Sequence, residues 1–179
     1  DAFIDAAGRR GFKDNWLQRA AIVLRCTGLR KQQAMRLLWS DVDMRSGELH
    51  VRPELGKIGQ ERSGRYVPLS PHLLEYLSTT GQRSGYIISC PRRVRELRGR
   101  DASRVWRDVA EHRGIDLEEI RGEPWKLFRA VFQSELRAKG ADSEAIKHLV
   151  GHSRGVQAHY ITPRSLPLAE AVALIPPLF

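Results

Sequence analysis

Residues 125–152 read WKLFRAVFQSELRAKGADSEAIKHLVGH, and their apolar side chains recur at three- and four-residue spacing. This periodicity predicts one helix over about 127–139 and a second, shorter helix over about 143–150. Gly140 suits the C-terminal cap of the first helix, and Asp142 suits the N-terminal cap of the second. Gly151 is expected to end the second helix, which places His152 on a helix-end turn.

The same helical periodicity continues on both sides of this pair. Further helices are expected over about 16–26, 30–38, 70–77, 101–113 and 166–174. The first of them breaks at Thr27-Gly28, so Arg30 lies in the first turn of the next. Ser70-Pro71 forms a good N-cap and first-turn pair for the third.

Two short strands are predicted within the helical sequence, over 48–52 and 65–69. Their connection is polar and rich in glycine, and it contains Lys57. Residues 86–88 are a candidate for a further strand. This order of elements predicts a single domain over residues 1–179 with an α+β fold, mainly α-helical, that includes a small antiparallel β-sheet.

The charge of the chain favours a polyanionic partner. It has 30 basic and 21 acidic residues, which gives a formal net charge of +9. A run of arginines occupies residues 92–113, where they either contact phosphates or form an ordinary solvated face of a helix. With 41% hydrophobic residues and no apolar run of about 18 residues, the sequence excludes a membrane-spanning protein.

Cysteine and histidine usage argues against disulfide and metal chemistry. Cys26 and Cys90 fit neither a disulfide framework nor a metal cluster, which indicates a reducing cytoplasm. His148 and His152 are four residues apart, but no third ligand is evident beside them. We therefore expect no metal and no cofactor.

Two pairs of motifs carry a resemblance to a known family. The first pair is TGLR at 27–30 and LLWSDVD at 37–43. The second is LFR at 127–129 and LVGH at 149–152, which separates Arg129 from His152 by 23 residues, and Tyr160 follows eight residues later. We call each pair of motifs a box. Together with the hairpin predicted between them, the two boxes resemble the catalytic domain of the tyrosine site-specific recombinases, the phage integrase family.

The resemblance implies an enzyme that breaks and rejoins double-stranded DNA through a 3′-phosphotyrosyl intermediate on Tyr160. Arg30 and Arg129 would clamp the phosphate, because an arginine fork stays charged and binds two oxygens at once. His152 would donate to a non-bridging oxygen, and Lys57 would protonate the leaving 5′-oxygen. Tyr160, whose free pKa is about 10, needs a positive cluster or a base to become nucleophilic.

The family resemblance also has consequences for assembly. It implies a dimer or tetramer on paired DNA sites that works without ATP or metal. The C-terminal segment, about 165–179, either docks on a neighbouring protomer or packs on its own chain. We expect the family's N-terminal core-DNA-binding domain to be absent from these 179 residues.

Three positions depart from the family's usual pattern. Lys126 stands where a histidine is common, three residues before Arg129. It can supply charge and a donor to phosphate, but it cannot act as a neutral base near pH 7 unless its pKa falls strongly. Gln33 replaces an acidic residue that supports the first arginine, and the interval from His152 to Tyr160 is one residue shorter than the commonest form.

Three other functions remain open at this point. A recombinase that has lost activity would bind DNA without cutting it, and Lys126 and Gln33 favour that alternative. A type IB topoisomerase would use similar residues to relax supercoiled DNA without site preference. A general basic nucleic-acid-binding fold would leave Arg30, Arg129 and Tyr160 apart in space. The target DNA sequence cannot be predicted, because phosphate contacts carry no base information.

Overall fold

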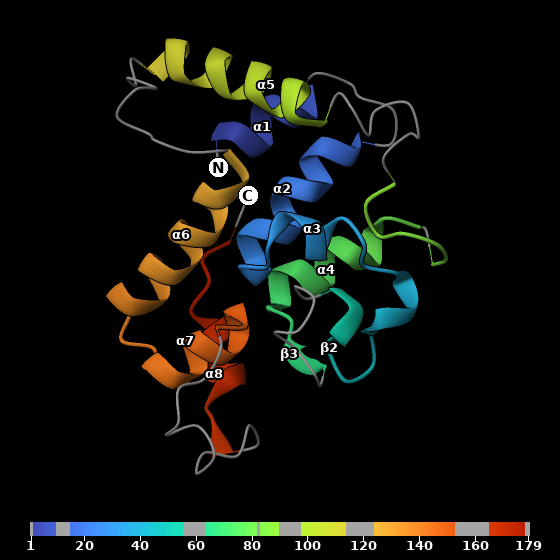
Figure 1. Cartoon of the computed structure of the whole chain (residues 1–179), viewed down its shortest axis with the longest axis vertical. Helices are drawn as coiled ribbons and strands as arrows, with labels where there is room; N and C mark the ends of the chain where they lie inside the picture. The colour runs from blue at the N-terminus through green and yellow to red at the C-terminus, as the bar shows by residue number, and fades with distance from the viewer. Residues whose placement is uncertain are drawn as a thin grey trace.

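The structure is a computed structural model that describes residues 2–9, 15–55, 64–81, 83–89, 98–113, 124–152 and 165–177. These residues form a mainly helical α+β fold with one small sheet (Figure 1). The helices are α1 (Ala2–Arg9), α2 (Trp16–Thr27), α3 (Lys31–Ala34), α4 (Pro71–Thr79), α5 (Arg98–Arg113), α6 (Pro124–Ala138), α7 (Ser143–Val150) and α8 (Leu168–Ala173). The strands are β1 (Val42–Asp43), β2 (Glu48–Val51) and β3 (Arg65–Pro68), and short 3₁₀ turns occupy Trp39–Asp41 and Pro53–Leu55.

Helix α2 lies at the centre of the fold, where it packs against α1, α3, α4 and α6 (Figure 1). Nearly all of its side chains are buried, including the charged Arg19 and Arg25. Arg19 Nη1 donates to the carbonyl of Ile87 at 3.1 Å, so this buried charge has a polar partner in the loop after α4. A helix buried on all sides requires such partners for its charged residues.

An aromatic cluster joins α1, α5 and α6 at one end of the core. Phe3 packs against Trp106, Trp125 and Phe128, with ring centroids 5.8, 6.3 and 5.4 Å away. Aromatic side chains bury large areas, and such tilted or edge-on pairs add about 0.5–1.5 kcal/mol each. Helix α1, which the sequence analysis did not predict, is held in place by this burial.

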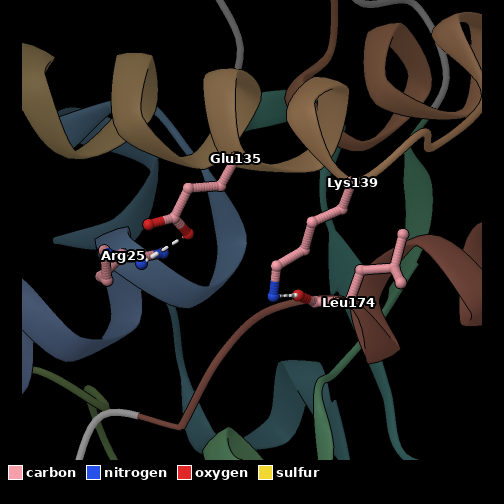
Figure 2. Close-up of polar contacts among 4 residues, drawn as sticks. All are labelled: Arg25, Glu135, Lys139 and Leu174. Carbon is pink, nitrogen blue, oxygen red and sulfur yellow. Dashed lines mark hydrogen bonds and ion pairs between the residues drawn. The ribbon is translucent and has the colours of Figure 1, made fainter.

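Two polar contacts attach α6 to neighbouring elements (Figure 2). Arg25 of α2 and Glu135 of α6 form an ion pair at 2.6 Å, with the arginine side chain only 4% exposed. One turn further along the chain, directly after the last residue of α6, Lys139 Nζ donates to the carbonyl of Leu174 at 2.6 Å. The second contact ties the end of α8 to the body of the domain. Helix α8 packs on α7 and β3 of its own chain, and docking on a neighbouring protomer stays a prediction.

The sheet is antiparallel in the order β1-β2-β3. Leu49 pairs with Val67 and His50 pairs with Tyr66, so buried and exposed side chains alternate along both longer strands. The two strands predicted over 48–52 and 65–69 are therefore confirmed, and the fold class is confirmed with them. The two-residue strand β1 was not predicted.

Several predicted helix caps are present. Ser70 Oγ accepts from the Leu73 amide at 3.3 Å, and Asp142 Oδ1 accepts from the Ala145 amide at 2.7 Å. Gly140 ends α6 in the left-handed conformation, with φ of 79°. These local signals fix where α4, α6 and α7 begin or end.

Several predicted elements were wrong in extent or type. Helix α6 begins at Pro124, three residues before the predicted start at residue 127. The helix over 30–38 stops at Ala34, because Leu38 is extended, bridges to Tyr86 and donates its amide to Asp41 Oδ2 at 2.8 Å. Residues 86–88 form only that isolated bridge rather than a strand. Helix α5 begins at Arg98, three residues before the predicted Asp101.

Candidate active site

The first predicted arginine, Arg30, sits at the tight break after α2. Gly28 ends α2 with φ of 61°, and its amide donates to Leu24 at 3.0 Å. A Cβ at Gly28 would lie 2.4 Å from Phe132 Cδ1, so only glycine lets α6 approach this closely. The short turn then places Arg30, half-buried, as the N-cap residue of α3.

Gln33 supports Arg30 through the backbone. Its Oε1 accepts from the Arg30 amide at 3.1 Å, and the side chain is only 1% exposed. In the family pattern, an acidic residue at this position supports the first arginine. An uncharged amide oxygen makes a hydrogen bond to this backbone in the structure.

The second predicted arginine, Arg129, connects the two boxes. Its Nη1 donates to the carbonyl oxygens of Gly28 and Val150, both at 2.7 Å. Arg30 Nη1 donates to the next carbonyl, that of Gly151, at 3.4 Å. The two arginines therefore meet at the C-terminal end of α7, where the carbonyl ends of the peptide dipoles favour positive charge.

The end of α7 also positions His152. Gly151, with φ of 67°, donates its amide to His148, and the His152 amide donates to Lys147, both at 3.0 Å. This is the Schellman pattern, which fixes the turn that follows a helix. His152 is exposed. Partial desolvation, followed by the positive charges of Arg129 and Arg30, lowers its pKa below the ordinary value.

Lys126 lies in the first turn of α6, three residues before Arg129 and therefore on a neighbouring part of the same helix face. Its side chain is exposed. Beside it, Lys31 Nζ lies 5.9 Å from the ring centroid of the buried Trp125. Lys31, the first residue of α3, thus lies near the N-terminal end of α6.

Residues 3–162 match the model of the Phage integrase family. The chain belongs to the phage integrase family. A comparison with curated protein sequences gives no match.

Solved structures share the fold of this phage integrase family member. An integrase from mycobacterium phage Brujita superposes with a TM-score of 0.62 at 18% identity, over 93% of this chain and 58% of that one. XerA recombinase superposes with a TM-score of 0.56 at 22% identity, over 91% of this chain and 57% of that one. The chain thus spans less than three-fifths of the length of either relative, and at these identities the likeness concerns the fold.

Two residues assigned by resemblance to the phage integrase family, Lys57 and Tyr160, lie outside the described residues. Of the remaining four, the structure brings Arg30, Arg129 and His152 together at the end of α7. Lys126 lies on α6, one turn before Arg129.

Arg65 is a neighbour of this cluster that was not among the predicted site residues. It begins β3, is buried, and lies against Gly151. The sequence signal available was an arginine at an inward-facing strand position, where charged side chains are rare.

The described ranges contain neither a group of metal ligands nor a helix that could span a membrane. There, no three His, Cys, Asp or Glu side chains gather to hold a metal ion. His148 is buried in α7, while His152 is exposed on the turn that follows. None of the described helices is long and apolar enough to cross a bilayer.

Proposed function

We propose that residues 1–179 form the catalytic domain of a tyrosine recombinase, which cleaves and rejoins double-stranded DNA through a 3′-phosphotyrosyl bond to Tyr160. The observation that supports this most strongly is the meeting of Arg30 and Arg129 at the end of α7, next to His152. In the sequence these residues lie in separate motifs, up to 122 positions apart (152 minus 30).

The cluster suits the charge that develops during attack on a phosphodiester. The two non-bridging oxygens gain negative charge in the transition state, and donors fixed in advance stabilise it without reorganisation. Arg129 is held by two carbonyls and Arg30 by one, so both guanidinium groups are positioned before DNA binds. His152 would donate to the same phosphate.

The cleavage step transfers the phosphorus from the 5′-oxygen of the DNA to the oxygen of Tyr160. The Tyr160 oxygen releases its proton to water and forms the bond to phosphorus, while the bond to the 5′-oxygen breaks. Lys57 gives a proton to that leaving oxygen as general acid. Rejoining reverses the step, since the free 5′-hydroxyl attacks the phosphotyrosyl bond and Tyr160 is released. Lys126 contributes charge rather than acting as a base.

A suicide DNA substrate tests this function directly. A nicked duplex that loses its 5′-hydroxyl fragment on cleavage should trap the chain as a covalent adduct, visible as a shift on a denaturing gel. The Tyr160→Phe variant should bind the same DNA and form no adduct. An adduct that persists in Tyr160→Phe would overturn the assignment of the nucleophile.

The suicide substrate, a plasmid-relaxation assay and a strand-exchange assay together separate the alternatives. A family member without activity gives no adduct with either variant while retaining DNA binding. A type IB topoisomerase relaxes any supercoiled plasmid, whereas a recombinase joins strands only between paired target sites. The hydrogen bond from the Arg30 amide to Gln33 favours the active enzyme, because it supports Arg30 without an acidic residue.

Double-stranded DNA is the partner that this proposal requires, and assembly into a dimer or tetramer follows from pairing two sites. The net charge of +9 supports the DNA partner. Analytical ultracentrifugation with and without a paired-site duplex tests the assembly. Sedimentation as a monomer under both conditions would contradict it.

A further inference from the structure

Arg65 occupies an unusual position for a charged residue. It is the first residue of β3 and pairs with Val51, on the inward face that it shares with Val67. It is only 9% exposed. Burying an arginine is unfavourable unless hydrogen bonds or other charges compensate, so its presence on this face calls for a specific role.

The guanidinium group of Arg65 covers Gly151. A Cβ built on Gly151 would lie 2.5 Å from Arg65 Nη1, 2.6 Å from Cζ and 2.8 Å from Nη2. Because the central carbon is about as near as the two nitrogens, the group presents its flat face to the glycine. Only a residue without a side chain leaves room for this contact, and φ of 67° at Gly151 favours glycine for a second reason.

The same turn holds the other arginines of the candidate site. Arg129 binds the carbonyl of Val150, and Arg30 binds the carbonyl of Gly151. Three guanidinium groups, from β3, α3 and α6, therefore surround two consecutive residues at the carbonyl end of α7. This end of a helix stabilises positive charge, which helps to accommodate them.

Arg65, which lies against Gly151, also lines a pocket of about 730 Å³ between the sheet and α8. Arg65 and His148 line the pocket, together with Tyr66 and Leu168, whereas Gly151 does not. Truncating Arg65 would open space next to Gly151. The turn could then move toward the sheet, and the carbonyl that holds Arg30 would move with it.

We propose that Arg65 is a positioning residue. Its flat guanidinium group holds the Gly151–His152 turn in place, and this keeps the side chains of Arg30 and His152 correctly positioned relative to Arg129. This inference rests on the proposed recombinase function for its catalytic consequence. Its structural part, the dependence of the turn on Arg65, can be tested without cleavage.

Cleavage is tested with two substitutions of different character. Arg65→Met keeps an unbranched, flexible apolar stem and removes the guanidinium group, with its charge and its flat face. Arg65→Lys keeps the charge and loses the flat face. We expect Arg65→Met to slow single-turnover cleavage of the suicide substrate at least tenfold, while the Kd for DNA changes less than threefold. Arg65→Lys should cleave faster than Arg65→Met but more slowly than the parent. Cooperative unfolding of each variant verifies that it folds.

Arg52→Met is the matched control. Arg52 follows β2 and pairs with Asp41 at 2.7 Å, away from Gly151, so its loss removes a partly buried arginine from the same sheet. Its cleavage rate should stay within about twofold of the parent. Equal rates for Arg65→Met and Arg52→Met would overturn the positioning role. Absence of an adduct with the parent chain would instead count against the recombinase function.

Two readouts are independent of catalysis. The NMR signal of His152 should shift in Arg65→Met and Arg65→Lys and stay unchanged in Arg52→Met. In addition, Gly151→Ala should lower the thermal stability more in the parent than in an Arg65→Ala background, where the added methyl group no longer meets a guanidinium. An unmoved His152 signal together with an equal effect of Gly151→Ala in both backgrounds would refute the inference, whatever the cleavage assay gives.

Discussion

Arg129 Nη1 donates a 2.7 Å hydrogen bond to the carbonyl of Gly28, 101 residues earlier in the chain. The bond is possible because Phe132, on the next turn of α6, packs directly on Gly28. One residue without a side chain therefore controls both the packing of α6 on α2 and the position of a proposed catalytic arginine. Stability and activity should be linked at this point.

Gly28→Ala should destabilise the domain by about 2–4 kcal/mol, since it adds left-handed backbone strain to overpacking against Phe132. Gly81→Ala is the matched control. Gly81 has a similar φ of 68°, but a Cβ there would meet nothing within 4 Å, so only the backbone cost of about 1–2 kcal/mol remains. Urea unfolding measures both, and equal losses would contradict the packing argument.

Arg129→Lys should lower the single-turnover cleavage rate by about 100-fold or more, although it keeps the charge. A lysine ammonium cannot hold the carbonyls of Gly28 and Val150 and also offer a flat fork to phosphate. Arg45→Lys, at the exposed turn before β2, should leave the rate unchanged. A rate for Arg129→Lys within threefold of the parent would show that charge alone suffices.

Glu135→Gln should destabilise the domain by about 2–3 kcal/mol, because it leaves the charge of the buried Arg25 without its carboxylate. The pair in Figure 2 connects α2 to α6, so the loss also weakens the contact between the helices that carry the two boxes. The exposed pair Glu144–Lys147 provides the comparison, and Glu144→Gln should cost less than about 1 kcal/mol. Similar costs from thermal unfolding would argue against the burial of Arg25 as the cause.

Features that depend on single residues or on a short repeating pattern of apolar residues could be predicted from the sequence. Ser70 and Asp142 cap helices as expected, and Gly151 ends α7 and orients the following histidine. Alternation predicted β2 and β3 within one residue at each end. The resemblance to the phage integrase family implied that Arg30 and Arg129 lie near one another, and both donate to carbonyls at the end of α7.

Features that depend on contacts between residues far apart in the sequence could not be predicted. The helix expected over 30–38 ends early because Leu38 pairs with Tyr86, a contact across 48 positions (86 minus 38). Helix α1 does carry a short helical pattern in Phe3, Ile4 and Ala7, which the sequence analysis missed. Its eight residues, however, are too few to be stable alone and depend on packing of Phe3 against α5 and α6. The approach of Arg65 to Gly151 likewise joins residues 86 positions apart (151 minus 65), and neither motif contains both.

Lys126→Met should weaken DNA binding and reduce the slope of log K against log salt concentration by about one, as expected for the loss of one phosphate contact. Lys126 is exposed on α6 near Arg129, so no large change in stability should accompany it. Lys126→Arg keeps the charge and should keep the slope. Fluorescence anisotropy over a range of salt concentrations measures all three proteins, and an unchanged slope for Lys126→Met would place this lysine away from the DNA.

His152 should titrate below its ordinary pKa of about 6.5, since partial desolvation and then Arg129 and Arg30 disfavour the imidazolium. Between the lowered pKa and about pH 6.5, the unfolded chain binds a proton that the folded chain does not. The contribution of His152 to stability therefore declines as the pH falls through this window and is complete above it.

DNA binding should reverse the effect on His152, because a bound phosphate stabilises the imidazolium between the two arginines. DNA affinity should therefore rise as the pH falls toward the pKa of His152 in the complex, and His152→Gln should remove that part of the pH dependence. NMR titration of the assigned imidazole, with and without a duplex, measures both values directly. A pKa that does not rise on DNA binding would mean that His152 does not face the phosphate held by Arg30 and Arg129.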